Sequence, residues 1–196
     1  MKRAWTTFSL CTSALLALAV ASSVVNAQKS APLLSYNEMT LAGLRPGRDS
    51  LAVAQKHYRA KYSSRDDNSS GEKQWSDGCT GHTLTLNLDS DGVIRRITVS
   101  ALVPIEGKCE SGRVEALDEK DWVTGRGLHL GDPQDRVSEL YGEPNSSGPS
   151  VKGDTEVEFL NYPLDKAGSE GPQTMEIFCA RDTGKVVEIT LGSSGL

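Results

Sequence analysis

Alternating apolar and polar residues predict two antiparallel β-hairpins. In TLTLNLDSDGVIRRITV, residues 83–99, leucine stands at every second position before Asp91-Gly92, and the chain then returns through IRRITV. A period of two is typical of a strand with one buried face, and Asp-Gly favours a tight turn with positive φ. The segment TMEIFCARDTGKVVEITL, residues 174–191, repeats the pattern around its own Asp-Thr-Gly turn. We expect both segments to form hairpins.

A short amphipathic helix is predicted before the second hairpin, in GLHLGDPQDRVSELYGEP. We expect Asp132 to cap its first amides and Pro133 to occupy its first position, where the missing N–H costs nothing. Its apolar residues share one face at spacings i, i+3 and i+4. They are Val137, Leu140 and Tyr141. Gly142 can adopt the left-handed conformation that ends a helix, and Pro144 prevents its continuation.

The loop and helix occur twice, 84 residues apart. The shared frame is T-x-x-G-L-x-x-G followed by a helix. The alignment places five identical residues on one another: Thr40 on Thr124, Gly43 on Gly127, Leu44 on Leu128, Gly47 on Gly131 and Val53 on Val137. The first helix is expected from about Ser50 towards Tyr62, longer than the second, because it lacks the Gly-x-Pro stop.

Each half is predicted to contain an entry loop, a helix, a connection and a hairpin, with a third strand near Trp75 in one half and over 156–162 in the other. One helix and one hairpin bury too little to be stable alone. The predicted fold is therefore α+β: two tandem helix plus antiparallel hairpin or meander repeats that form one sheet with helices on one face. The expected organisation is a signal peptide at 1–27, repeat 1 at 28–110 and repeat 2 at 111–196.

Polar segments are expected to connect these elements. The stretch GKCESGRVEAL, residues 107–117, is predicted as the boundary between the repeats. The segments 63–73 and 145–154 are rich in Ser, Gly and Asn, and we expect them to be loops.

The first residues are typical of a secretory signal peptide. Lys2 and Arg3 precede an apolar stretch that includes residues 14–21, and Val25-Asn26-Ala27 offers the small residues that a signal peptidase requires. We expect cleavage before Gln28, which leaves 169 of the 196 residues. Cys11 lies inside the apolar stretch rather than just after it, so no lipid anchor is expected. The protein is predicted to be periplasmic or secreted, with no stable membrane insertion.

The charge balance argues against nucleic acid as a partner. Removal of Lys2 and Arg3 from the 21 basic residues leaves 19 against 26 acidic residues, a net charge of about −7. A chain that binds nucleic acid through its phosphates usually carries a basic excess.

Export into an oxidising compartment changes how the cysteines are interpreted. Cys79 and Cys109 flank the first predicted hairpin, whose ends must come together, so we expect a disulfide between them. Cys179 lies in a strand among Met175 and Ile177 and is expected to be buried. A reactive Cys179 thiol is the alternative, although no His or Asn pattern accompanies it.

A G-L-x-x-G-x-x-x-x-x-V helix followed by a hairpin, used twice in an exported chain, resembles the tandem repeat of β-lactamase-inhibitor-like proteins. It is also similar to the single unit of the SmpA/OmlA outer-membrane assembly lipoproteins. The resemblance covers most of residues 33–191. It implies a helix-layered antiparallel sheet whose other face binds protein.

Catalytic and metal-binding patterns are weak. The three histidines lack the spacing and neighbouring cysteines of a zinc site. DSDG at residues 89–92 begins like a calcium loop but lacks the later ligands, and the turn alone explains it. The glycines form no phosphate-binding motif, and no nucleophile elbow occurs. We expect no metal, no cofactor and no catalytic residues.

The side of the sheet opposite the core is the predicted binding surface. The alternation places on it Thr85, Asn87, Arg96 and Thr98 in one half, and Glu176, Phe178, Glu188 and Thr190 in the other. Phe178 is the only aromatic residue among these, and an aromatic side chain on a polar face is either covered or offered to a partner. Three further candidates lie just outside the predicted regular elements, with packing beneath a loop as the alternative for each. They are Trp75, Trp122 and Tyr162.

The sequence thus favours an exported, non-catalytic protein-binding or cell-envelope scaffold module. Its predicted partner is a protein of the cell envelope or the extracellular space, contacted through Phe178, Trp75, Trp122, Tyr162 and Arg96. The alternatives are an inhibitor of a secreted hydrolase, an enzyme of unknown type and a membrane-associated assembly factor.

Overall fold

A computed structural model describes residues 40–58, 63–64, 71–77, 80–102, 122–164 and 172–193. These residues belong to one compact unit, Pro32–Leu196. The predicted signal peptide, the boundary at 107–117 and the predicted Cys79–Cys109 disulfide lie outside the described residues.

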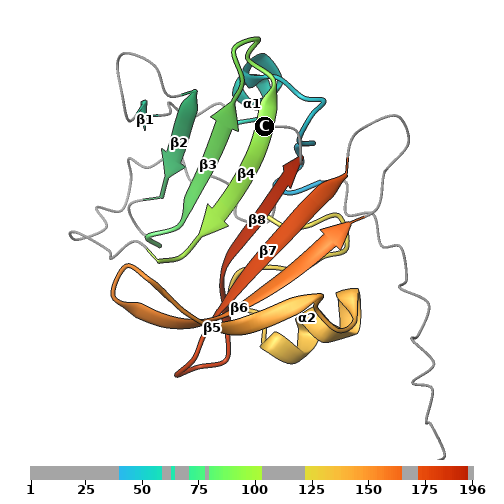
Figure 1. Ribbon diagram of the computed structural model, residues 1–196. Helices are drawn as coiled ribbons and strands as arrows, with labels where there is room; N and C mark the ends of the chain where they lie inside the picture. Colours follow the sequence, from blue (N-terminus) through green and yellow to red (C-terminus); the bar gives the residue numbers. More distant parts are fainter. Residues whose placement is uncertain are drawn as a thin grey trace, which may run out of the picture. The chain divides into compact units, whose positions relative to one another are not determined.

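Within these ranges the fold is mixed α+β, with two helices and one antiparallel sheet of eight strands (Figure 1). The helices are α1 (Leu51–His57) and α2 (Gln134–Tyr141). The strands are β1 (Ser63–Ser64), β2 (Glu72–Ser76), β3 (Thr83–Leu88), β4 (Ile94–Ser100), β5 (Ser146–Lys152), β6 (Thr155–Leu164), β7 (Gln173–Ala180) and β8 (Val186–Ser193). Their order in the sheet is β1-β2-β3-β4-β8-β7-β6-β5, so the two halves of the chain meet where β4 pairs with β8.

Both predicted hairpins are present, as β3–β4 and β7–β8. Each contains a register shift near its turn, between Asn87 and Leu88 in the first and between Phe178 and Cys179 in the second. Gly92 has the positive φ of 76° that the Asp-Gly turn predicts. The third strands are also present, since β2 contains Trp75 and β6 covers the predicted 156–162.

The junction of β4 with β8 has a symmetric register. Thr98 pairs with Thr190, and on either side Ile97 pairs with Leu191 and Val99 with Ile189. A shift of 92 residues exchanges the pair Ile97–Leu191 with the pair Val99–Ile189 and leaves Thr98–Thr190 unchanged. Thr98 and Thr190 therefore stand at the centre of the junction.

Both helices differ in detail from the prediction. Helix α1 ends at His57 and is one residue shorter than α2, because Tyr58 adopts an extended backbone and turns its buried ring toward Trp75. Asp132 does not cap α2, since its Oδ2 accepts a hydrogen bond from the His129 N–H at 2.8 Å. Gly142 ends α2 with φ 74°, as predicted.

The helix alignment also needs a one-residue correction. Val53, aligned above with the buried Val137, is 45% exposed, and the fully buried helix residue is Ala54. The start of each helix confirms the shift, because Ser50 bridges Val93 as Pro133 bridges Lys185. The fully buried helix residues Ala54 and Val137 are thus 83 residues apart, whereas the preceding glycines of the shared frame are 84 apart.

The segment 145–154 was expected to be a loop, and most of it is strand β5. It pairs with β6 over the whole range from Ser146 to Lys152. Ser, Gly and Pro have low β-propensity, but Pro149 is tolerated because β5 is the last strand of the sheet and has a free edge.

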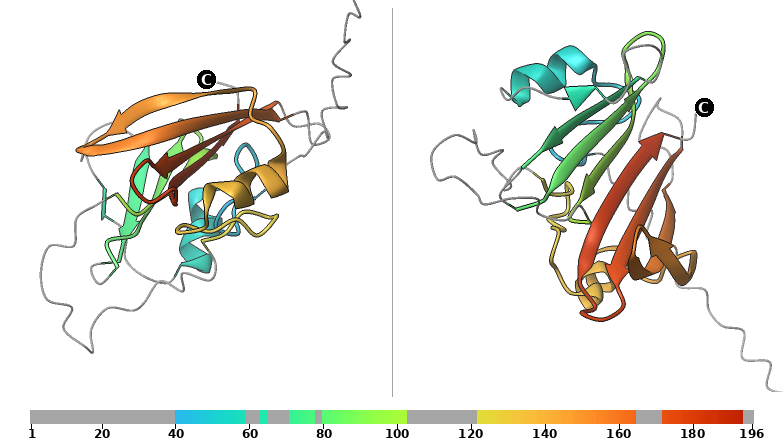
Figure 2. Two further views of the ribbon diagram at one scale, coloured as in Figure 1. Left: turned by 90° about the horizontal axis from the view of Figure 1, so that it is seen from below. Right: turned by 90° about the vertical axis from the view of Figure 1, so that its left-hand side faces the viewer.

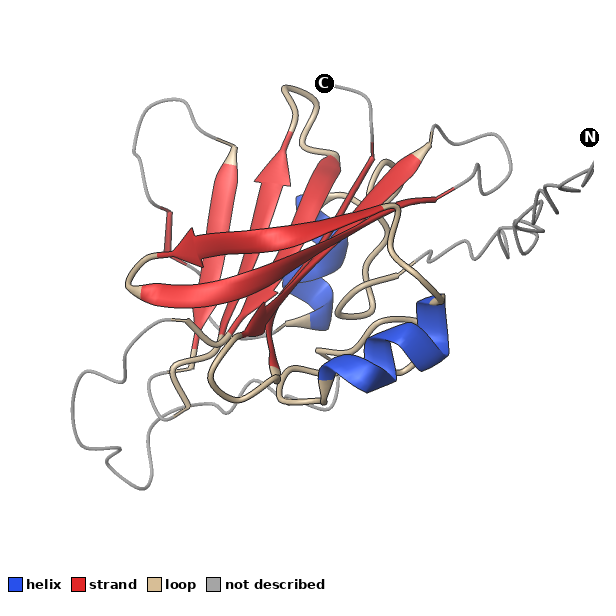
Figure 3. Cartoon of the chain, turned by 60° about the horizontal axis from the view of Figure 1, so that its bottom comes forward, coloured by secondary structure: helices blue, strands red, loops and turns tan. Residues whose placement is uncertain are grey.

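One hydrophobic cluster joins both helices to the sheet. Figure 3 shows the two helices and the strands of the sheet. Helix α1 contributes Ala54, helix α2 contributes Val137 and Tyr141, and the central strands contribute residues such as Leu84 and Ile189. Apolar residues occupy every second position along β3, at Leu84 and Leu86, and along β8, at Ile189 and Leu191, which places these side chains on one side of the sheet. The other side is called the polar face below.

Candidate functional site

A row of polar side chains crosses the polar face from one side of the sheet to the other. Its members are successive register partners on neighbouring strands. In the order β2, β3, β4, β8, β7, β6 and β5 they are Gln74, Thr85, Thr98, Thr190, Glu176, Asn161 and Ser146. Neighbouring strands are about 4.8 Å apart, so the row is roughly 29 Å long.

Hydrogen bonds within the row hold its side chains in place. The hydroxyl oxygens of Thr98 and Thr190 are 2.9 Å apart, and Gln74 Nε2 donates to Thr85 Oγ1 at 3.3 Å. Thr190 is buried, with 6% of its surface exposed, whereas Thr98 and Thr85 are half-buried and can also bond to water or to another molecule. The row therefore presents ordered donors and acceptors rather than an apolar surface.

Arg96 lies exposed beside this row, as predicted. Its register partners are Asn87 on β3 and Gly192 on β8. A Cβ at Gly192 would lie 3.6 Å from Arg96 Nε, an ordinary van der Waals distance, so the arginine side chain lies against the neighbouring strand. Asn87 Nδ2 in turn donates to Glu72 Oε2 at 3.3 Å. This end of the polar face is a charged, solvent-accessible corner.

Phe178 is on the polar face but is not exposed, which corrects the prediction that it is an accessible anchor. Only 5% of it is accessible. The ring of Phe159 lies 5.2 Å from that of Phe178, centroid to centroid, and Lys152 Nζ lies 4.1 Å from the Phe178 centroid. The sequence could not show this covering because Lys152 belongs to the segment predicted as a loop.

Lys152 also forms an ion pair with Glu188, the register partner of Phe178. Lys152 Nζ and Glu188 Oε1 are 2.8 Å apart, and the glutamate is only 8% exposed. Strands β5 and β8 are three positions apart in the sheet, which in a flat sheet would separate them by about 14 Å. The sheet must therefore curve so that the β5–β6 hairpin bends over the polar face, and Figure 2 shows this bend.

Trp75, Trp122 and Tyr162 are core residues and not surface anchors. Their exposed fractions are 1%, 2% and 5%. Trp75 contacts Tyr58 with a centroid separation of 5.7 Å, and Tyr162 contacts Tyr141 at 5.8 Å. Burial, with a smaller contribution from the charge of Glu143, raises the pKa of Tyr162 to about 12. The alternative reading of these residues as packed aromatics is thus the correct one.

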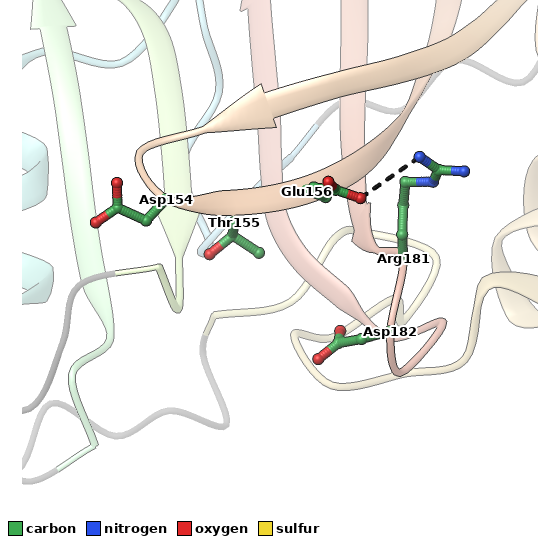
Figure 4. Close-up of a pocket in the computed structure, with 5 residues that line it drawn as sticks. All are labelled: Asp154, Thr155, Glu156, Arg181 and Asp182. Carbon is green, nitrogen blue, oxygen red and sulfur yellow. Dashed lines mark ion pairs between the residues drawn. The ribbon is translucent and has the colours of Figure 1, made fainter.

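A shallow hollow of about 560 Å³ lies between the turn of the β5–β6 hairpin and that of the β7–β8 hairpin (Figure 4). It is lined by Asp154, Thr155, Glu156, Arg181 and Asp182. Arg181 Nη1 lies 3.6 Å from Glu156 Oε2, and both side chains are more than half exposed. Across the described part of the chain, no group of three or more His, Cys, Asp and Glu residues has the geometry to hold a metal ion.

Asp89, the first residue of the calcium-like DSDG segment, is engaged by its own turn. Its Oδ1 accepts hydrogen bonds from the backbone N–H groups of Asp91 and Val93, each at 2.9 Å, and its Oδ2 accepts one from Arg95 Nε at 2.7 Å. These bonds, led by that from Val93, lower the pKa of the carboxyl group. The residue thus stabilises the hairpin turn.

Cys179 is buried, as expected, with 1% of its surface exposed. Burial is the main cause that raises the pKa of its thiol to about 11, and the nearby charge of Glu158 adds to it. A thiol with a raised pKa is a poor nucleophile at neutral pH because little thiolate forms.

No helix in the described ranges is both long and apolar enough to cross a membrane. No protein-family model matches the sequence, and no curated protein matches it either. Among solved structures, the chain is similar to a DUF4309 family protein, YjgB, from Bacillus subtilis, with a TM-score of 0.47, 10% identity and coverage of 80% of this chain and 88% of that one. It is also similar to a cysteine-rich secretory protein from Staphylococcus aureus, with a TM-score of 0.43, 8% identity and coverage of 80% of this chain and 47% of that one. At this level of similarity the two structures identify neither a family nor a function for the chain.

Proposed function

We propose that this chain is an exported, non-catalytic binding module that recognises a protein partner through the polar face of its sheet. The observation that carries the proposal is the row of ordered polar side chains centred on Thr98 and Thr190, with the exposed Arg96 beside it. Export rests on the signal-like leader, which would deliver the chain to the periplasm or the exterior of the cell.

The placement of the helices supports this choice of face. Side chains of α1 and α2 belong to the same hydrophobic cluster as Leu84 and Ile189, and in Figure 2 (left) both helices lie on the side of the sheet opposite the arching β5–β6 hairpin. We infer that the helices cover the core side alone. The polar face is then the side of the sheet left for a partner.

A tandem duplication supports the same architecture. The two halves share the symmetric β4–β8 register and register shifts at matching places in their hairpins. Two aspartates also have matching roles, because Asp49 accepts a hydrogen bond from the Arg45 N–H as Asp132 does from the His129 N–H, each at 2.8 Å. We infer that repeats 1 and 2 descend from one unit, with the polar face continuous across both.

The dimensions of the polar face suit a protein better than a small molecule. Measured along the curved sheet, a width of roughly 29 Å over seven strands and a strand length of about 20 Å give an area on the order of 600 Å², including the part beneath the β5–β6 hairpin. One partner in a stable protein complex contributes about 800 Å², whereas small molecules bind in enclosed, mostly apolar pockets.

A charge reversal on the polar face tests the proposal. Arg96→Glu is expected to weaken partner capture from the native host at least tenfold without changing the thermal midpoint of the protein. Arg136→Glu on α2 is the matched control. Arg136 is also exposed, and the substitution reverses the same charge on the helical side of the sheet. Equal capture by the Arg96→Glu variant and the parent protein would contradict the proposal. If the captured partner is a secreted hydrolase, loss of its activity on binding would identify the module as an inhibitor.

A further inference from the structure

The ammonium group of Lys152 occupies a small box on the polar face. One wall is the ring of Phe178, whose centroid lies 4.1 Å from Nζ, and another is the carboxylate of Glu188, 2.8 Å from Nζ. Phe159 packs against Phe178 and holds its ring in position. The box is thus an aromatic face combined with a negative charge, an arrangement that attracts organic cations.

The walls of this box come from the interior of the sheet. Phe178 and Glu188 are register partners on β7 and β8. Strand β7 pairs with β6 and β8, and β8 pairs with β4 and β7, so the backbone positions of both residues do not depend on β5. Their exposed fractions of 5% and 8% include the cover that Lys152 provides.

The lysine comes from a weakly anchored element. Strand β5 contributes no residue to the hydrophobic cluster, and its Ser147, Pro149 and Val151 are exposed. It is the last strand of the sheet and has one neighbour, β6. Segments with few buried apolar contacts open at low free-energy cost, so the Lys152 end of β5 can leave the box while β7 and β8 stay paired.

We propose that Phe178 and Glu188 form a binding site for a primary alkylammonium group, which Lys152 occupies as a built-in ligand. A lysine side chain of the partner is the group that replaces it. This last step rests on the proposed function, whereas the preference of the box for an ammonium group does not. Lys152 then acts as an internal competitor that holds the hairpin over the polar face until a partner lysine arrives.

Chemical rescue tests the box without a partner. Lys152→Ala removes the internal ligand, a side chain that is 38% exposed. The probe that replaces it is n-butylammonium chloride. A ligand of this size is expected to half-saturate the site on the order of millimolar. At tenfold that concentration the thermal midpoint of the variant should rise by roughly 3–5 °C relative to sodium chloride at equal ionic strength.

Two controls decide the outcome. The parent protein and the Lys152→Ala/Glu188→Gln double variant should show no such rise, because the box is filled in one and lacks its charge in the other. Lys152→Ser provides the same cavity if the alanine variant does not fold. Absence of a rise in the single variant, or an equal rise in all three proteins, would overturn the ammonium site. A positive rescue combined with an unchanged partner affinity in Glu188→Gln would keep the site and reject the partner lysine.

Discussion

The side chains of Thr98 and Thr190 meet at the centre of the polar face, with their hydroxyl oxygens 2.9 Å apart. Thr98 belongs to β4, the last strand of the first half, and Thr190 to β8, the last strand of the second. The contact therefore joins equivalent positions of the proposed repeats. It also continues the polar row from one half into the other.

The contributions of the two hydroxyls to stability should be coupled. Thr98→Val is expected to lower the free energy of unfolding by about 1 kcal/mol, because the hydroxyl of Thr190, a buried residue, loses its partner. The Thr98→Val/Thr190→Val double variant should lose less than the sum of the two single variants. Urea unfolding of all four proteins measures this coupling, and strictly additive losses would show that the hydroxyls do not interact.

The Lys152–Glu188 ion pair should contribute measurably to stability, in contrast to surface pairs. Lys152→Ala leaves a glutamate that is 8% exposed without its cation, and we expect a loss of about 1–3 kcal/mol. Arg136→Ala is the matched control, since its pair with Glu139 is as short, 2.9 Å, but lies on the exposed side of α2. That control should change stability by less than about 0.5 kcal/mol. Similar losses in both variants would mean that the hairpin is not held by Lys152.

Phe178→Ser should destabilise the protein. The ring is 5% exposed and packs against Phe159 and Lys152, so its removal is expected to cost about 2–4 kcal/mol. The midpoint of thermal unfolding measures the loss. A variant as stable as the parent would instead support the original interpretation of Phe178 as an accessible anchor.

The buried thiol of Cys179 should make stability fall at alkaline pH. Its pKa in the folded protein is raised from the model-compound value of 9.0 to about 11, so the unfolded chain releases the proton first as pH rises. The contribution is constant below pH 9 and declines between pH 9 and 11, by up to about 3 kcal/mol. Tyr162, whose pKa is raised from 10.0 to about 12, adds a similar decline at higher pH.

Cys179→Ala separates the thiol from the tyrosine. Denaturant unfolding at pH 8 and at pH 10.5 gives the loss of stability for each protein, and the loss should be smaller in the variant. The comparison uses this difference because truncation of a buried side chain lowers stability at every pH. Equal losses in both proteins would show that the thiol does not titrate differently in the folded state.

Local patterns predicted the two hairpins and the end of α2 at Gly142 because these features depend on residues that are close together in the sequence. Period-two alternation reports which side of a strand is buried, and a positive φ at a turn or helix end selects glycine. Gly47 and Gly131, which the shared frame aligns, have positive φ values of 80° and 85°. Each glycine donates its N–H to the carbonyl oxygen of the first residue in the last strand of its half. Gly47 donates to Ile94 and Gly131 donates to Val186.

The accessible side chains were harder to predict because burial depends on contacts far apart in the sequence. Alternation correctly placed Phe178 on the polar face, but its covering by Lys152 requires both strand β5 and curvature of the sheet. Strand β5 itself has a composition that favours loops, and pairing with β6 outweighs that preference. The burial of Trp122 likewise depends on packing near His82, 40 residues earlier in the chain.

Site-specific photo-crosslinking tests the central claim that the polar face binds the partner. A photoreactive residue is placed at Arg96 on the polar face or, as a control, at the exposed Glu139 on α2, and each variant is expressed in the native host. We expect one discrete protein adduct from position 96 and none from position 139. An adduct from position 139 alone would contradict it, because the partner would then bind the helical side of the molecule.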